Sequence, residues 1–286
     1  MENIFDFENK IDIAWCPGCG NYSIRKAFLA AIKELNLSQG NLVLVSGIGQ
    51  AAKMPQYINT NYFNGLHGRG IPPATAIKAC NPDLNVVAFG GDGDMYGEGG
   101  NHFLHATRRN PDITLFVHNN MIYGLTKGQA SPTSEIGMKT KLQVFGVSEK
   151  PLNPIALAIS LDVTFVARAF SGHIEKTKEI MKKAISHKGF ALVDIFQPCV
   201  SFNKINTFKW FEDNTFYLPD DFNSSDRARA FNKSLEEEPF PLGIFYKSNH
   251  RKTFEENLEV FKNGKLPLYK NELNKHKVEA EIRAKI

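Results

Sequence analysis

The sequence predicts an α/β protein with a doubly wound, mainly parallel sheet. Two observations support this fold class: short apolar, β-branched runs that are typical of buried strands, and helical patterns between them. This alternation is typical of sheets with helices on both faces. The predicted strands are 41–46, 85–89, 113–118, 162–167 and 190–196.

Each predicted helix has a boundary signal or an amphipathic face. The first has apolar residues on one side, from Ile24 to Leu35. Another follows Pro72-Pro73, and the last ends at Gly189, a residue suited to a helix C-cap. The predicted helices are 21–37, 72–79, 98–109, one from about 153, and 174–187.

Beyond Val200 the pattern changes. The chain becomes irregular and aromatic, and from about Ser225 it becomes charged and helical. We therefore expect an α/β domain at residues 11–200 and a C-terminal extension at residues 201–286.

Composition excludes several functional classes. A net charge of +4 over 286 residues is too weak to indicate nucleic-acid binding. No run approaches the roughly 18 apolar residues of a membrane span, and the N-terminus lacks a basic-then-apolar signal peptide. We expect a cytoplasmic protein that does not bind membranes. Its four cysteines are too few for a disulfide scaffold, so they favour metal or redox chemistry.

The central motif is Gly90-Gly91-Asp92-Gly93-Asp94 together with Asn119-Asn120. Each part follows a predicted buried strand, so both are expected at the edge where open α/β sheets bind ligands. A carboxylate and an amide oxygen suit a hard cation such as Mg²⁺, which also binds phosphate. The alternative is two ordinary turns rich in glycine and asparagine.

A second glycine motif, Gly47-Ile48-Gly49 followed by Ala52, matches the G-x-G-x-x-A form of a dinucleotide site. That interpretation predicts an NAD(P)-dependent enzyme with an acidic residue about 20 positions later. None occurs between Ala52 and Asp83, so the dinucleotide interpretation is weak.

Cys16 and Cys19 form a Cys-x-x-Cys pair at the entrance to the first helix, where the backbone dipole favours thiolates. Cys199 follows the last predicted strand. His67, in a glycine-rich loop, either binds diphosphate oxygens or is an exposed basic residue. Lys53 either neutralises a substrate carboxylate or lies on the surface.

The Asp92 and Asn120 motif resembles the thiamine-diphosphate motif. Together with WCPGCGN, SGIG, LHGRG and the segment ending at Cys199, it resembles the β subunit of a 2-oxoacid:ferredoxin oxidoreductase, over about residues 11–203. The resemblance implies thiamine diphosphate, Mg²⁺ and a [4Fe–4S] cluster as cofactors. It also implies a thiamine-diphosphate-binding fold.

The resemblance implies the following roles by position. Lys53 would face the substrate carboxylate and Leu125 would border the reactive ring. The Mg²⁺ ligands would be Asp92, Asn120 and the backbone of Ile122. Other cofactor contacts would come from Gly47, Ile48, Gly49, His67, Gly91 and Gly93. Cluster ligands would be Cys16, Cys19 and Cys199.

One position departs from the resemblance: Gln50 stands where the family usually has its remaining cluster cysteine. Cys80 is expected at the opposite edge of the sheet, roughly 20 Å away, as a buried small hydrophobe. Three possibilities stay open: three cysteines with a non-thiolate ligand, a labile cluster, or none. We favour a cluster.

The implied activity is oxidative decarboxylation of a 2-oxoacid, such as 2-oxoglutarate or a pyruvate-like acid. Coenzyme A would take the acyl group and ferredoxin the electrons. The partners would be the α subunit, which supplies a catalytic glutamate, and any further small subunits. The main alternative is a non-redox decarboxylase or synthase subunit that depends on thiamine diphosphate.

Overall fold

The computed structural model describes residues 4–7, 10–262, 264, 266–271 and 275–285. Eight strands form one sheet in the order β2-β1-β3-β4-β6-β5-β8-β7. The strands are β1 (Leu42–Ser46), β2 (Asn61–Asn64), β3 (Asn85–Gly91), β4 (Thr114–Asn119), β5 (Phe165–Phe170), β6 (Ala191–Phe196), β7 (Thr215–Tyr217) and β8 (Phe240–Lys247). β1 to β6 pair in parallel and β8 runs antiparallel to β5, which confirms the predicted fold class.

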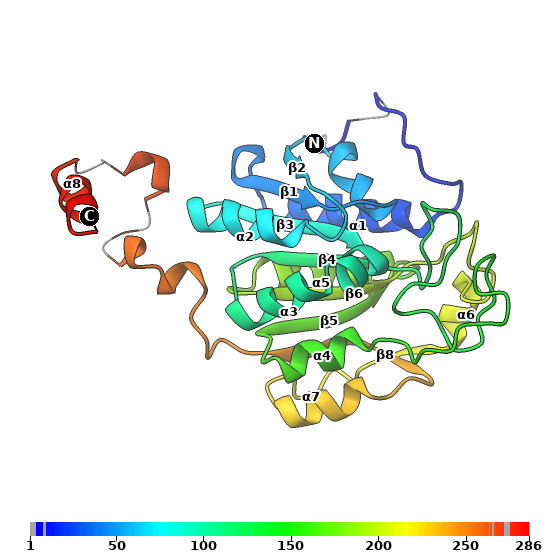
Figure 1. Cartoon of the computed structure of the whole chain (residues 1–286). Coiled ribbons are helices and arrows are strands. Elements are labelled where there is room, and N and C mark those ends of the chain that lie inside the picture. Colours follow the sequence, from blue (N-terminus) through cyan, green and yellow to red (C-terminus); the bar gives the residue numbers. More distant parts are fainter. Residues whose placement is uncertain (1–3, 8–9, 263, 265, 272–274, 286) are drawn as a thin grey trace.

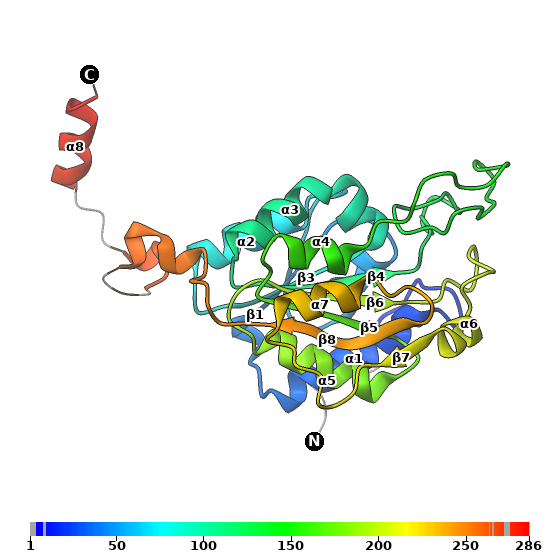
Figure 2. The same cartoon turned by 90° about the horizontal axis from the view of Figure 1, so that it is seen from below.

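Helices cover both faces of this sheet (Figure 1). The α-helices are α1 (Gly20–Glu34), α2 (Ile71–Cys80), α3 (Gly100–Arg109), α4 (Pro154–Ser160), α5 (Ile174–Ile185), α6 (Phe208–Asp213), α7 (Arg227–Ser234) and α8 (Lys275–Arg283). Shorter helical turns are η1 (Gln39–Asn41), η2 (Ala51–Tyr57), η3 (Gly93–Glu98), η4 (Glu255–Asn257), η5 (Glu259–Phe261) and η6 (Leu268–Lys270). α1 and α5 lie on one face, and α2, α3, α4 and α7 lie on the other (Figure 2).

Buried aromatic rings fill the space between the layers. On the α1 face, Phe28 packs edge-on to Phe89 at 5.0 Å between ring centroids, and Phe89 lies 5.4 Å from Phe116. On the opposite face, the Phe103 ring of α3 lies 6.3 Å from Phe190. Burying each phenyl group stabilises the fold by roughly 2–3 kcal/mol, so these rings hold the helices against the sheet.

The central strand is longer than predicted. β3 continues to Gly91, so Asp92 follows it directly, and the helix expected from Glu98 begins at Gly100. The π-helical turn η3 fills the interval between them. Such turns are rare and occur frequently at functional sites.

The C-terminal part contributes more to the sheet than its irregular sequence indicated. β7 and β8 were not predicted, and β8 begins at Phe240, within the part of the chain expected to be charged and helical. β5 pairs with β8 only from Gly243 to Lys247, so Pro241 lies outside that ladder and its missing N–H removes no hydrogen bond to β5. The buried ring of Phe211 stacks on Phe196 at 4.8 Å, which joins α6 to the sheet.

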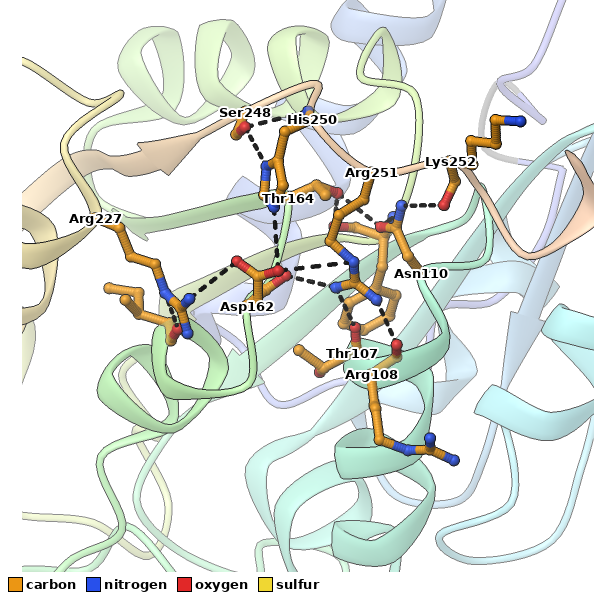
Figure 3. A network of polar contacts seen from close by, with 12 residues as sticks. Thr107, Arg108, Asn110, Asp162, Thr164, Arg227, Ser248, His250, Arg251 and Lys252 are labelled. Carbon is orange, nitrogen blue, oxygen red and sulfur yellow. Dashed lines mark hydrogen bonds and ion pairs between the residues drawn. The ribbon is translucent and has the colours of Figure 1, made fainter. Parts of the chain in front are cut away.

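The segment after β8 is fastened across the amino ends of the strands (Figure 3). Arg251 donates hydrogen bonds to the carbonyls of Thr107, Arg108 and Asp162, where α3 and α4 end. His250 lies 3.1 Å from the Asp162 carboxylate. α8 stands away from the sheet in both overall views. None of the helices in the described ranges has the length and apolar character needed to cross a membrane.

Candidate functional site

One edge of the sheet gathers most of the residues that the sequence singled out. β3, β4 and β6 are in register, with Gly91 beside His118 and Asn119 beside Phe196. The segments that follow the parallel strands therefore meet at one carboxyl edge, where open α/β sheets bind ligands. These segments are 47–50, 92–94, 120–122 and 197–199.

Asp92 is a buried carboxylate, only 1% exposed. Its Oδ2 atom accepts hydrogen bonds from Thr133 Oγ1 at 2.7 Å and from Ser131 Oγ. Burial raises the pKa of Asp92 to about 6, and the nearby Asp194 carboxylate adds to the shift. A bound cation would stabilise the ionised form, because an opposite charge counters the cost of burial.

A second acid, Asp94, joins two loops to the end of β3. Its Oδ1 atom accepts from the backbone nitrogens of Ile48 at 3.1 Å and Gly68 at 2.7 Å. A Cβ atom at Gly47 would lie 2.2 Å from Asp94 Oδ2, so only glycine fits there. Burial raises the pKa of Asp94, and the hydrogen bonds from Gly68, Ile48 and His67 oppose that shift.

His67 makes its main contact with that acid. The Nδ1 atom of His67 lies 2.7 Å from Asp94 Oδ1, and its Nε2 atom lies 3.6 Å from Glu98. Its side chain is 39% exposed at the rim of the edge. This position leaves the diphosphate role of His67 a proposal.

Asn119, the first residue of the pair, connects Asp92 to a buried ion pair. Its Nδ2 atom donates to Asp194 at 3.1 Å, and its Oδ1 atom lies 2.8 Å from the Thr133 hydroxyl. Asp194 lies 3.2 Å from Arg168 Nε and accepts from the Tyr96 hydroxyl at 3.0 Å. Burial raises the pKa of Asp194, and the Arg168 charge opposes the shift.

Asn120 has different partners. Its Oδ1 atom accepts from Ile122 N at 3.1 Å, and its Nδ2 atom donates to Gln197 at 3.2 Å. In the described part of the chain, Asp92 and Asn120 have no hydrogen-bond partner in common. Both side chains lie at the same sheet edge. Thr133 connects Asp92 to Asn119 and not to Asn120.

The loop after Ile122 folds over the glycines. A Cβ atom at Gly93 would lie 2.1 Å from the Tyr123 ring, whose hydroxyl lies 3.0 Å from Glu98. Leu125 is 43% exposed on this loop. Lys53 lies at the start of η2, with its Nζ atom 3.4 Å from the carbonyl of Ala14. Both residues therefore lie in rim segments, and their catalytic roles stay proposals.

Three of the four cysteines line one pocket. Burial raises the pKa of Cys19 to about 11, and the neighbouring Cys199 and Cys16 thiols add to the shift. Among the described residues, no three His, Cys, Asp or Glu side chains are grouped to hold a single metal ion. The polar residues of this pocket include Cys16, Cys19, Cys199, Gln50, Asn120 and Gln197.

Cys80 does not line this pocket, in keeping with its predicted place away from the other three cysteines. The prediction that it is buried was wrong. It ends α2 and is exposed. The buried positions of this helix are Ile71, Ala74 and Lys78. Lys78 forms an ion pair of 2.8 Å with Asp112, which compensates for the burial of its charge.

Several site residues gave no sequence signal. Thr133 and Ser131 come from a loop far along the chain, and Arg168 lies in the middle of an apolar strand. Asp94 is the exception. As a second acid inside the same glycine motif, it had a signal that the Mg²⁺ interpretation assigned to Asp92 alone.

Two family descriptions match the chain. Residues 40–195 match the thiamine pyrophosphate enzyme C-terminal TPP-binding domain. Residues 199–263 match the C-terminal part of the pyruvate ferredoxin oxidoreductase beta subunit.

Characterised relatives agree with these matches. The β subunit of 2-oxoacid:ferredoxin oxidoreductase 1 from Aeropyrum pernix is 45% identical over 256 residues, covering 85% of this chain and 80% of that protein. The corresponding subunit from Saccharolobus solfataricus is 44% identical, with 85% of each chain covered.

A solved structure of 2-oxoglutarate:ferredoxin oxidoreductase from Magnetococcus marinus superposes with a TM-score of 0.90. Sequence identity is 34%, and the match covers 97% of this chain and 94% of that one.

The chain belongs to the β subunits of the 2-oxoacid:ferredoxin oxidoreductases.

Membership in the 2-oxoacid:ferredoxin oxidoreductase β subunits confirms the resemblance seen in the motifs and makes the chain an oxidoreductase subunit. It also confirms a domain of the thiamine-diphosphate-binding type. The dinucleotide interpretation loses its support, because the segment that contains Gly47 lies within the match to a thiamine pyrophosphate-binding domain.

Proposed function

We propose that this β subunit binds thiamine diphosphate through Mg²⁺ and oxidatively decarboxylates a 2-oxoacid in complex with its α subunit. Coenzyme A would accept the acyl group and ferredoxin the electrons. The observation that carries this proposal is the buried Asp92 carboxylate at the sheet edge that also holds Asn120 and three cysteines. In addition, the Magnetococcus marinus enzyme has 2-oxoglutarate, coenzyme A and succinyl-CoA bound.

The residues present fit a divalent cation. Asp92 is buried beyond the reach of bulk water, and its raised pKa reflects that burial. Oxygen ligands are those that Mg²⁺ prefers. Asp92, the Asn120 side chain and the backbone carbonyl of Ile122 would hold the ion.

The diphosphate would lie between two loops that Asp94 ties together. Gly47, Ile48 and Gly49 come from one loop and Gly91 and Gly93 from β3 and η3, so backbone groups can approach closely. His67 would add a donor from the rim. When bound, thiamine diphosphate supplies a carbon nucleophile for the keto group and an electron sink.

The chain's own side chains would orient the substrate. Lys53, at the rim, would attract the carboxylate of a 2-oxoacid, and Leu125 would shield the reacting atoms from water. Tyr123 packs against Gly93 and hydrogen bonds to Glu98, so it fixes the loop that carries Leu125.

The cysteine pocket fits an iron–sulfur cluster. Each thiolate of a cluster binds a different iron, so the three cysteines need not surround one ion. Cys16, Cys19 and Cys199 would hold it. Asn120 lines the same pocket, which would place the cluster next to the Mg²⁺ site and make electron transfer short.

We propose that the two parts of the chain have different roles. Residues 11–200 would carry both cofactors, and residues 201–286 would support the sheet and contact the α subunit. The two family matches, which meet near residue 197, support this division. We propose that the complex acts in the cytoplasm with ferredoxin.

The test is an activity assay on the chain co-produced anaerobically with its α subunit. We expect reduction of a viologen dye that requires both a 2-oxoacid and coenzyme A, with one carbon dioxide released for two electrons. Carbon dioxide release without dye reduction would instead support a non-redox decarboxylase. Loss of both would refute the proposal.

A further inference from the structure

Gln50 lies in the wall of the cysteine pocket. It follows the tight turn after β1 and precedes η2, and its backbone carbonyl accepts a hydrogen bond of 2.8 Å from Trp15 Nε1. Since Cys16 is the next residue after Trp15, this bond fixes Gln50 beside the Cys-x-x-Cys loop. Cys16, Cys19, Cys199 and Gln50 line one pocket.

The side-chain oxygen of Gln50 is free to bind a ligand there. Gln50 Oε1 is buried, and in the described part of the chain it has no hydrogen-bond partner. Buried polar atoms are almost always paired, so each exception calls for a role. An oxygen with unused lone pairs in a thiol-lined pocket is suited to coordinate a metal ion.

A [4Fe–4S] cluster needs one terminal ligand for each iron. The pocket supplies three thiols, and Cys80, the remaining cysteine of the four, is exposed at the end of α2. α2 leads into β3, whereas the pocket lies beyond the other ends of the strands. The described part of this chain therefore has no cysteine placed to bind the fourth iron.

We propose that three thiolates hold the cluster of this β subunit and that the side-chain oxygen of Gln50 binds its fourth iron. This inference rests on the proposed function, which places a cluster in the pocket. A neutral oxygen in place of a thiolate makes the cluster one unit less negative.

Two properties follow. A less negative cluster is reduced more easily, as when imidazoles replace thiolates in Rieske centres. The oxygen-bound iron is also the most weakly held. Oxidation by ferricyanide, a one-electron oxidant, would then release it: [4Fe–4S]²⁺ gives [3Fe–4S]⁺, Fe²⁺ and one electron, which ferricyanide accepts.

The test compares anaerobically prepared α–β complexes of the wild type, Gln50→Ala and Gln50→Cys. We expect an iron chelator to remove one iron severalfold faster from Gln50→Ala than from the wild type, and slowest from Gln50→Cys. Ferricyanide should generate the paramagnetic three-iron signal in the wild type and little in Gln50→Cys. The reduction potential should fall in Gln50→Cys.

Two variants control the assignment. Cys16→Ala should lower the iron content, which attributes the cluster to this pocket, and Cys80→Ser should leave it unchanged. Equal iron release from the wild type and Gln50→Ala would overturn the role of the oxygen. Equal release and equal potential in the wild type and Gln50→Cys would overturn the labile fourth iron. An iron content that is the same in Cys16→Ala as in the wild type would overturn the placement of the cluster in this pocket, and the inference with it.

Thiamine diphosphate content is measured on the same samples. If thiamine diphosphate and 2-oxoacid decarboxylation are retained while the iron results fail, the Gln50 inference alone is wrong. If thiamine diphosphate is also absent, the proposed function fails with it.

Discussion

The hydroxyl of Thr133 lies 2.7 Å from the Oδ2 atom of Asp92. The same hydroxyl lies 2.8 Å from Asn119, which in turn donates to Asp194. Asp194 pairs with Arg168, so a continuous chain of polar contacts runs from a buried ion pair to the proposed Mg²⁺ carboxylate. We expect this chain to hold Asp92 in place before the cofactor binds.

Thr133→Val tests the last contact of that chain. Valine keeps the shape of threonine and loses the hydroxyl, and a hydrogen bond to a charged group contributes about 1.5–3 kcal/mol. We expect affinity for Mg²⁺ and thiamine diphosphate to fall about tenfold or more, measured by titration of the apo complex. Thr75→Val, the same substitution on α2, should leave affinity unchanged; an equal loss there would contradict the assignment.

The Arg168–Asp194 pair is expected to stabilise the fold around Asn119. Both side chains are buried, so Arg168→Met or Asp194→Asn leaves one group without its charged partner. Each change should lower stability by about 3 kcal/mol. The double variant should lose less than the sum, measured by thermal unfolding of the complex. Strictly additive losses would show that the two residues do not interact.

Gly47→Ala tests the packing of the first glycine loop. The new Cβ atom would meet Asp94 Oδ2 at 2.2 Å, so the loop or the acid must move. Such overpacking costs about 1–3 kcal/mol, and thiamine diphosphate affinity should fall with it. Gly40→Ala is the matched control, because a Cβ atom there meets nothing within 4 Å. Unchanged affinity in Gly47→Ala would argue against a cofactor role for this loop.

We expect the protein to lose stability in mild acid because His187 is buried in its neutral form. Burial lowers the pKa of His187 to about 4, Lys247 adds to the shift and Asp112 opposes it, while Nε2 lies 3.0 Å from the Thr164 hydroxyl. Since the unfolded chain binds the proton more tightly, stability is fully present above about pH 6.5 and is lost as the pH falls toward 4. In His187→Gln, the melting temperature should change less between about pH 7 and about pH 5 than it does in the wild type. An unchanged slope would contradict this.

The sequence was a good guide wherever a residue directly follows a strand. Asp92, Asn120 and Cys199 each come after an apolar run, so the parallel sheet brings them to one edge. Gln50 was likewise recognisable from its place after the SGIG turn. These positions depend on local pattern and on the direction of the strands.

Contacts made over long sequence separations were not predictable. Thr133 lies 41 residues from Asp92, and Tyr96 lies 98 residues from Asp194. Their positions depend on how loops fold back onto the sheet. β8 was missed because its glycine and proline weaken the strand signal in the sequence. The strand forms because it pairs with β5, a contact that local propensity does not include.

The central claim is that Asp92 binds Mg²⁺ and thereby holds thiamine diphosphate in this β subunit. The most direct measurement is the amount of magnesium and thiamine diphosphate bound by purified α–β complexes of the wild type and Asp92→Ala. We predict that the wild type retains both in equal amounts and that Asp92→Ala loses both together while its subunits remain assembled. An assembled Asp92→Ala complex that keeps thiamine diphosphate at the wild-type level would contradict the account.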